Sequence, residues 1–126
     1  MANTFKAYTK SSVGTSAATA YEVELGGAST KTAIIIGIAL SNVASSPINV
    51  DVQIDRPAAG TTAAPSDDVY LAKNIPIPSG STLEVMAGQK LILEYNGTAL
   101  AGDKIVVTSD TVSSLDVIVN ALEITS

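Results

Sequence analysis

Five short apolar runs decide the fold: VYLA (69–72), TLEVM (82–86), KLILE (90–94), KIVVT (104–108) and LDVIVNALEIT (115–125). They follow one another between Gly, Pro, Asn and Ser residues, which are the usual turn formers. Their apolar residues are too clustered to make a stripe at positions three and four apart, so no helical period survives. The sequence therefore predicts an all-β chain.

Working outward from these runs, the same pattern continues to the N-terminus. The expected strands span residues 5–10, 19–25, 31–41, 48–55, 69–74, 82–86, 90–95, 104–109 and 115–125. A single flat sheet would leave one apolar face in water, so eight to nine short strands predict two packed sheets. We expect one domain over residues 1–126 with a two-sheet β-sandwich or jelly-roll-like fold. Residues 1–16 are expected to be an edge strand or an N-terminal arm.

Three strands carry patterns that predict which side chains are buried. Between Ile48 and Asp55, aliphatic residues alternate with polar ones, which predicts one buried and one wet face. Between Ala33 and Leu40, the even-numbered residues (Ile34, Ile36, Ile38 and Leu40) are expected on one face. The mostly small odd-numbered residues would lie on the other face, covered by the same chain or by a partner. In the last strand the apolar parity changes after Val119, which predicts a β-bulge near residues 120–122 or burial of both faces.

The composition favours a protein that binds other proteins. The 126 residues are 46% hydrophobic and only 15% charged, and the mean hydropathy is +0.34. Part of so apolar a surface is expected to face another protein. The net charge is −5, and the seven basic residues are scattered singly, whereas nucleic-acid binding needs clustered cations. The longest apolar run, Ala33 to Leu40, is far below the roughly 20 residues of a membrane-spanning helix. We expect neither a nucleic-acid nor a membrane partner.

The sequence offers little catalytic chemistry. It contains no His and no Cys, which removes the common neutral-pH base, the thiol nucleophile and the usual zinc sites. A mechanism that uses only carboxylates would draw on pairs of acidic residues. The candidates are Asp51, Asp55, Asp67, Asp68, Glu84, Glu94 and Asp103. Most are expected to face outward on strands or to lie at turns, where carboxylates are solvated. We therefore expect no enzyme, no catalytic residue and no cofactor.

Two loop features remain as candidate sites. Asp67 and Asp68 could donate oxygens to calcium, but their spacing matches no EF-hand loop and calcium needs about six to eight ligands. A solvated strand entry is the preferred interpretation over a metal site. The long loop at residues 57–66 is rich in Ala, Thr, Gly and Pro and is a candidate contact loop. The candidate interface residues are Phe5, Tyr8, Arg56, Thr61 and Thr62.

Three features of the second half of the chain point to a known family. They are a Pro-x-Pro-x-Gly connector at residues 76–80, a Gly-Asp-x-Ile strand entry at residues 102–105, and a closing Asp-Val-x-Val…Leu-Glu-Ile-Thr at residues 116–125. In these features the chain resembles a family of small virion proteins encoded by tailed bacteriophages. The resemblance covers roughly the last 60 residues well and the N-terminal half loosely. Residues 98–101 are an insertion relative to that pattern.

The resemblance implies a structural role on the virus particle. The first expectation is a capsid decoration (cement) protein that stabilises a phage head by bridging major capsid proteins. The second is a tail, neck or fibre component. Either role implies localisation to the virion, assembly in the host cytoplasm, and contacts with other virion proteins and with further copies of the chain as a trimer or dimer. A receptor- or glycan-binding β-sandwich is the alternative from another class, although the chain has no Trp to serve as a sugar platform.

Overall fold

The computed structural model describes residues 2–23, 31–55, 69–85, 90–95 and 103–125. These residues form nine strands and no helix. The strands are β1 (Ala2–Val13), β2 (Ala18–Glu22), β3 (Lys31–Asn42), β4 (Ile48–Asp55), β5 (Val69–Ile77), β6 (Thr82–Glu84), β7 (Leu91–Tyr95), β8 (Lys104–Ser109) and β9 (Leu115–Thr125). All nine expected strands are present. β5 continues through Pro76 because it lies at a sheet edge, where the missing N–H of Pro removes no ladder bond.

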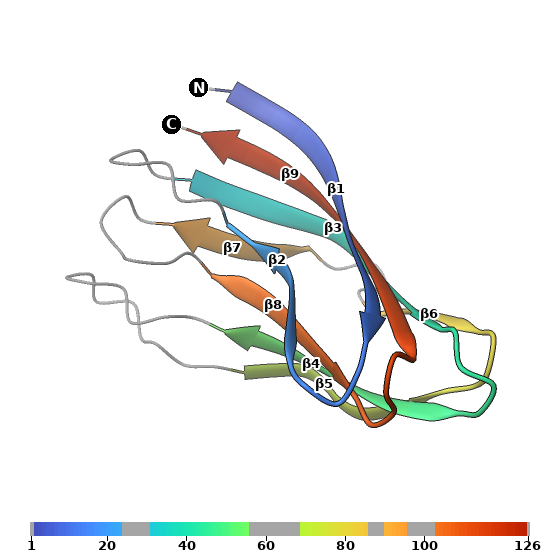
Figure 1. Cartoon of the computed structure of the whole chain (residues 1–126). Helices are drawn as coiled ribbons and strands as arrows, with labels where there is room; N and C mark the ends of the chain where they lie inside the picture. The colour runs from blue at the N-terminus through green and yellow to red at the C-terminus, as the bar shows by residue number, and fades with distance from the viewer. Residues whose placement is uncertain (1, 24–30, 56–68, 86–89, 96–102, 126) are drawn as a thin grey trace.

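The strands form nested pairs, in which strands near the two ends of the chain pair outside those near its middle. β1 pairs with β9, β2 with β8, β3 with both β6 and β7, and β4 with β5, all antiparallel. Two further pairings gather the strands into sheet A (β1-β9-β3-β6, with β7 also on β3) and sheet B (β2-β8-β4-β5). If β6 and β7 are counted as one interrupted strand, this nested order is that of a jelly roll. The expected fold class is confirmed, and Figure 1 shows the two chain ends side by side on β1 and β9.

The N-terminal residues form an edge strand within this chain. β1 pairs with β9 in an unbroken register from Ala2 opposite Thr125 to Lys10 opposite Val117. The register then shifts before Val13, where Ser12 has a φ of 57° and donates its N–H to Asp116 Oδ1 at 3.0 Å. This bulge turns the chain from the edge of sheet A towards the edge of sheet B, where β2 begins.

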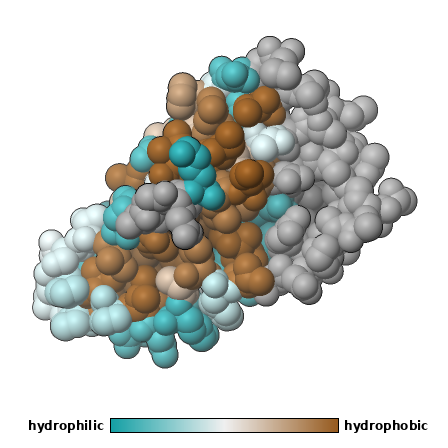
Figure 2. Space-filling view, turned by 180° about the vertical axis from the view of Figure 1, so that it is seen from behind, coloured by the Kyte–Doolittle hydropathy of each residue, from teal (hydrophilic) through white to brown (hydrophobic). Residues whose placement is uncertain are grey.

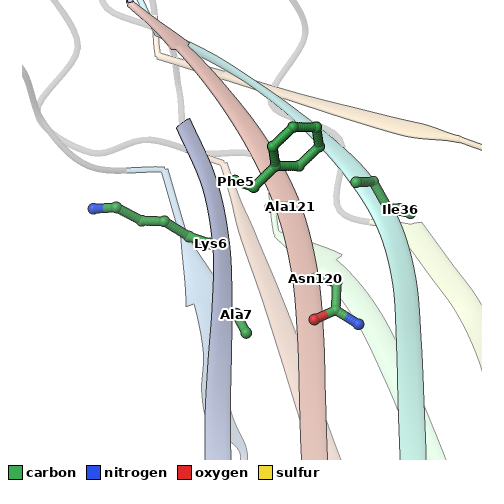
Figure 3. A pocket seen from close by; sticks show the side chains of 6 residues that line it. All are labelled: Phe5, Lys6, Ala7, Ile36, Asn120 and Ala121. Atoms are coloured by element: carbon green, nitrogen blue, oxygen red, sulfur yellow. The ribbon is translucent and has the colours of Figure 1, made fainter. Parts of the chain in front are cut away.

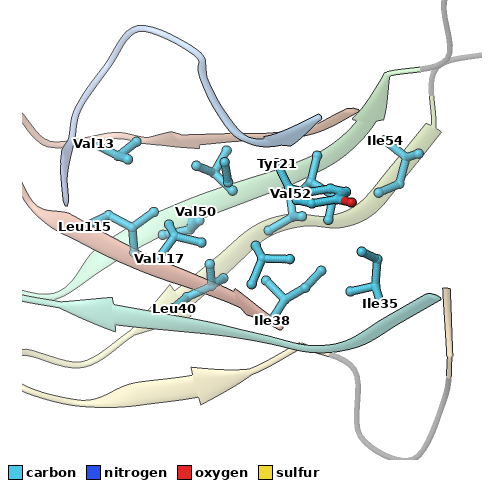
Figure 4. Close-up of a cluster of buried hydrophobic side chains, with 14 of the residues drawn as sticks. Val13, Tyr21, Ile35, Ile38, Leu40, Val50, Val52, Ile54, Leu115 and Val117 are labelled. Carbon is cyan, nitrogen blue, oxygen red and sulfur yellow. The ribbon is translucent and has the colours of Figure 1, made fainter. Parts of the chain in front are cut away.

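The core lies between the two sheets (Figure 4). In β4 the aliphatic residues from Ile48 to Ile54 are buried and the residues between them are exposed or half-buried, as the alternation predicted. β8 follows the same rule, with Ile105 and Val107 buried. Burial of each such side chain stabilises the fold by about 1.5–3 kcal/mol, so a slip of one residue in either strand would be costly.

The expectation for β3 is wrong because this strand carries a bulge. Ile35 lies opposite Ala121 in β9, but Gly37 lies opposite Asn120, so Ile36 is an extra residue. The buried face therefore changes from odd to even numbers: Ile35 and Ile38 both point into the core, whereas Ile36 is exposed. The odd-numbered residues Ala33 and Ile35 are covered by the core of the same chain.

The bulge coincides with the interruption of the edge strand. β7 pairs with β3 up to Ile35, and β6 pairs with β3 from Ala39 onward. Between these pairings Glu84 Oε1 accepts the N–H of Ile38 at 3.0 Å, in place of a strand carbonyl. A Cβ on Gly37 would stand only 3.3 Å from that same oxygen, which explains the glycine. The Glu84 carboxylate thus holds the bulge.

The expected bulge in the last strand is absent. The pairing of β9 with β1 is continuous through residues 120–122, and the register shift against β3 lies on β3. The inward parity set by Val117 and Val119 continues through Ala121 to Glu123. Leu122 and Ile124 are half-buried on the outward side of sheet A. The apparent change of phase therefore reflects apolar residues on both sides of the strand.

Asn42 ties the end of β3 to two other segments. It is buried, and its Nδ2 donates to the carbonyls of Ser46 and Ile77, each at 2.9 Å. Its Oδ1 accepts the N–H of Ala44 at 2.8 Å. One carboxamide therefore satisfies three backbone groups, of which the bond to Ile77 is buried and the other two are part-buried.

Substitution of Glu84 tests the role of its carboxylate in the bulge. Glu84→Ala removes the acceptor of the Ile38 N–H and should lower the free energy of unfolding by about 1–2 kcal/mol. Glu84→Gln keeps a side-chain oxygen at the same place and should retain most of the stability. Urea unfolding followed by circular dichroism measures both values. Equal stability of Glu84→Ala and the unchanged chain would show that the bulge does not need this contact.

Asn42→Ala should be more damaging. It leaves the Ile77 carbonyl without its buried bond and removes two part-buried bonds, so we expect a loss of about 2–4 kcal/mol. Asn42→Asp is the matched variant, because it keeps the shape and the acceptor but loses both donors. It should also be destabilised by more than about 1 kcal/mol. If Asn42→Asp were as stable as the unchanged chain, the two bonds donated by Nδ2 would not be important.

Candidate protein-binding face

The outward side of sheet A carries an apolar row across four strands. Paired residues in neighbouring strands share a face of the sheet. Phe5 on β1 lies opposite Leu122 on β9, which lies opposite Ile34 on β3, which in turn lies opposite Ile92 on β7. We call this side of sheet A the outer A face. Its most exposed large side chains are Phe5 (75%), Ile92 (57%), Ile36 (47%) and Ile118 (43%).

The outward side of sheet B provides an internal comparison. Its equivalent row runs from Tyr70 on β5 through Gln53 on β4 and Val106 on β8 to Thr19 on β2. The next row joins the charged residues Asp55, Lys104 and Glu22. Apart from Tyr70 and Val106 these residues are polar or charged, so this outer B face is the more polar of the two, as expected for a sheet in water. The same chain thus has one outer face suited to water and one that is not, and Figure 2 shows apolar surface gathered across the molecule when it is seen from behind.

A shallow pocket lies at the centre of the outer A face. It has a volume of about 300 Å³ and is lined by Phe5, Lys6, Ala7, Ile36, Asn120 and Ala121. Figure 3 shows Phe5, Asn120 and Ile36 on three neighbouring strands, with Lys6 directed away from them. The small side chain of Ala7, opposite Asn120, leaves room between the larger Phe5 and Ile36, whereas the side chain of Ala121 points into the core. The bulge in β3 is what brings Ile36 to its rim.

Two acidic side chains that the structure describes on the outer A face already have backbone partners. Glu84 accepts the N–H of Ile38, and Asp116 accepts the N–H of Ser12. Both stand towards the same end of the sheet, because Glu84 pairs with Ala39 and Asp116 pairs with Ser41. In the apolar row itself the side chains carry no charge. This electrostatic character suits contact with another apolar protein surface and offers nothing to a strongly charged ligand.

The structure separates the two predicted interface residues of the first strand. Phe5 lies on the outer A face, whereas Tyr8 has the opposite parity and faces inward. The Tyr8 ring packs edge-on against Tyr21, with centroids 4.8 Å apart. Both hydroxyls donate to Oε2 of the buried Glu123, from Tyr8 at 3.1 Å and from Tyr21 at 2.6 Å, and Lys6 Nζ lies 3.7 Å from Oε1. Tyr8 is therefore part of an internal cluster and not of the face.

The electrostatics of this cluster act on Tyr8. Burial raises the pKa of its phenol above the ordinary 10.0, and the nearby negative charge of Glu123 raises it further. Both effects favour the neutral hydroxyl, which can donate its proton to the carboxylate. Tyr8 thereby joins the edge strand β1 to the middle of the sandwich.

The other predicted sites are not brought together in the part of the chain that the structure describes. Arg56, Thr61, Thr62 and the rest of the 57–66 loop lie outside the described residues, and so do Asp67 and Asp68. Among the other acidic candidates, the side chain of Glu94 is not described, Asp103 is buried, and Asp55 lies on the outer B face. Asp51 belongs to sheet B, where it accepts the N–H of Asn74 at 2.7 Å and pairs with Lys73.

The described residues contain no group of three or more acidic side chains arranged to hold a metal ion. Within the same residues there is no helix of the length and apolar character needed to cross a membrane.

Sequence reasoning missed four residues of the outer A face: Ile36, Ile92, Ile118 and Asn120. One signal was available for Ile118 and Asn120, because the burial of Val117 and Val119 places their even-numbered neighbours on the opposite side. No local signal marks Ile36, since its exposure depends on the bulge. Ile92 sits in an apolar run that is equally consistent with burial on both sides.

The Tyr8 cluster makes a prediction about alkaline pH. Because the folded pKa of Tyr8 is raised, its contribution to stability is fully present below pH 10.0 and is lost as the pH rises through the folded pKa. Tyr8→Phe should cost about 1 kcal/mol at neutral pH. The difference in unfolding free energy between the two proteins should then shrink above pH 10.0. Urea titrations across this range measure the difference, and a value that stayed constant would contradict the linkage.

The comparisons with known proteins add no assignment to this geometry. The chain was compared with family models, with curated proteins and with solved structures. None of the three comparisons found a match.

Proposed function

We propose that this chain is a non-enzymatic structural protein of a phage virion: a capsid decoration (cement) protein that stabilises the head by bridging major capsid proteins. The observation that carries the proposal is the contrast between the two outer faces. A sheet face that exposes Phe5, Ile36, Ile92 and Ile118 to solvent is suited to binding another protein. The polar outer B face shows that this composition is not general to the chain.

The chemistry of the residues supports a binding role over a catalytic one. The full sequence has no His and no Cys. In the described part, the carboxylates of Asp51, Glu84 and Asp116 each accept a backbone N–H and so serve the fold. The pocket on the outer A face is shallow, and Asn120 supplies its only polar side-chain group besides Lys6, which points away. Such a site can receive an apolar side chain from another protein.

The fold and the family resemblance narrow the role. Jelly rolls occur in viral capsid proteins, lectins and cupins, so the fold alone does not choose among them. The resemblance of residues 69–97 and 102–125 to small virion proteins of tailed phages favours the first of these. A cement role also explains how a small face can be sufficient. Many weak contacts of identical copies on a lattice hold together what a single contact could not.

Phage particles prepared with and without this protein test the proposal. Particles that lack it should release their DNA at a lower temperature or after milder osmotic shock, because the bridges between capsid subunits are missing. Adding back the purified chain should restore resistance. Release can be followed with a DNA-binding dye during heating. Particles whose resistance is the same with and without the protein would rule out the cement role.

Two further measurements separate the alternatives. A denaturing gel of purified virions gives the copy number, which should be comparable to that of the major capsid protein for a cement protein and far lower for a tail, neck or fibre component. A glycan array probed with the full chain addresses the receptor-binding alternative. Specific glycan binding at useful affinity would favour a lectin role over the cement role.

A further inference from the structure

We infer that the outer A face is the interface of a twofold dimer, in which a second copy of this chain covers the face and inserts its Phe5 into the pocket beside Asn120. This inference rests on the proposed function, because it names the partner of the same adhesive face. It assigns the outer A face to self-association and leaves the outer B face and the remaining surface for the capsid.

The outer A face carries both a projection and a matching depression. Phe5 is the most exposed large apolar side chain among the described residues, and it stands at the rim of the pocket. An isologous interface requires this arrangement, since each copy must offer the same surface it receives. A volume of about 300 Å³ is ample for one phenyl ring. A twofold axis in the plane of the interface, passing near Asn120, brings each Phe5 over the pocket of the other copy.

Asn120 also favours a second copy of the chain as the partner. Its carboxamide is exposed at the centre of an apolar surface, and it has no side-chain hydrogen bond within the described residues. A purely apolar partner would bury this group without a partner, which is unfavourable. Under twofold symmetry the two Asn120 carboxamides meet, and a carboxamide can donate to and accept from another of its kind. A second copy of the chain therefore provides hydrogen-bond partners for the Asn120 carboxamide, whereas an apolar surface of another protein would not.

The distribution of charge favours the same face for self-association. The chain has a net charge of −5, so two copies repel each other at most orientations. The apolar row that contains Phe5, Leu122 and Ile92 carries no charge. Glu84 and Asp116, whose carboxylates the structure describes on this face, lie away from Asn120 towards one end and accept backbone N–H groups. The centre of the outer A face is thus the surface on which two copies approach with least repulsion.

The area available fits a weak dimer. If a large apolar side chain has roughly 150–250 Å² of surface, the exposed fractions of the four main residues amount to roughly 400 Å². The smaller residues between them increase this area. A standard interface takes about 800 Å² from each partner, and smaller ones are transient. We therefore expect dissociation in the micromolar range.

A twofold dimer also explains how a small chain bridges two capsid subunits. A bridge needs two binding surfaces, and a monomer with one capsid-binding surface has only one. Pairing through the outer A face creates two copies of every remaining surface, which are related by symmetry and lie on opposite sides of the dimer. The outer B faces, with Asp55 and Lys104, then point away from each other.

Sedimentation velocity of the purified full chain tests the dimer. Between about 1 µM and 1 mM the chain should change from monomer to dimer. Phe5→Glu puts a charge at the anchor and should raise the dissociation constant by at least about 30-fold. Because Phe5 is exposed in the monomer, the circular dichroism spectrum and melting temperature of a dilute sample should not change. The matched control is Val112→Glu, since Val112 is 73% exposed but lies in the turn between β8 and β9. It should alter the constant by no more than about twofold.

A cross-linking experiment tests the position of the symmetry axis. The chain has no Cys, so one introduced thiol reports on one position. A disulfide needs Cα atoms about 4.4–6.8 Å apart. A twofold axis that passes near residue 120 brings the two copies of this residue together, so Asn120→Cys should form a covalent dimer under mild oxidation. Val112→Cys should not do so at the same concentration. A chain that stays monomeric to 1 mM overturns the inference, as does a trimer, or a dimer that Phe5→Glu leaves intact.

The failure of this inference can be distinguished from failure of the proposed function. Dimerisation is measured on the isolated chain, and capsid stabilisation is measured on particles. A monomeric chain that still protects particles would remove the dimer and keep the cement role. A dimer that never affects particles would keep the interface and remove the cement role.

Discussion

The bulge in β3 is the constraint on which both the core and the surface of this molecule depend. Without the extra residue, Ile35 and Ile38 would lie on opposite sides of sheet A, and one half of the strand would turn its large residues away from the core. With it, both are buried and Ile36 is expelled to the outside. The Glu84 carboxylate makes this possible, because it accepts the Ile38 N–H at the point where the edge strand is interrupted. One backbone irregularity thus completes the core and creates the rim of the pocket.

The nested pairing explains why so much depends on contacts between distant residues. β1 pairs with β9 and β2 with β8, so the outermost strands of the chain meet only when the inner ones have folded back. Such long-range pairing is slow to form and needs side chains that fix the register. The buried contacts described above do this: Asn42 joins β3 to the end of β5, and Tyr8 and Tyr21 meet at Glu123. These polar groups hold segments of the fold together in the interior and are not part of the outer A face.

How far the sequence predicts this structure follows from the range of each interaction. The nine strands and the one-sided burial of β4 could be predicted, because turn residues and alternation are local signals. The faces of β3 could not, since the bulge is held by Glu84, 46 residues away in sequence. The same limit applies to the candidate site. Phe5 and Tyr8 were both predicted as interface residues, and nothing local distinguishes them, because the bond of Tyr8 to Glu123 joins residues 115 apart in sequence.

The proposed dimer also has to stop at two copies, and the asymmetry between the faces explains how. An apolar face that met a different surface on the next copy would build an open chain of molecules. Here the exposed apolar residues are concentrated on the outer A face, while the outer B face carries Asp55, Lys104 and Glu22 and, on its edge strand, the half-exposed Tyr70. Once two A faces are joined, the surfaces that remain are less apolar and belong to an assembly with twice the net negative charge of one chain. Repulsion between such dimers grows with that charge, whereas the apolar area that drove association is already buried. The chemistry that makes one face adhesive therefore requires the other to stay polar.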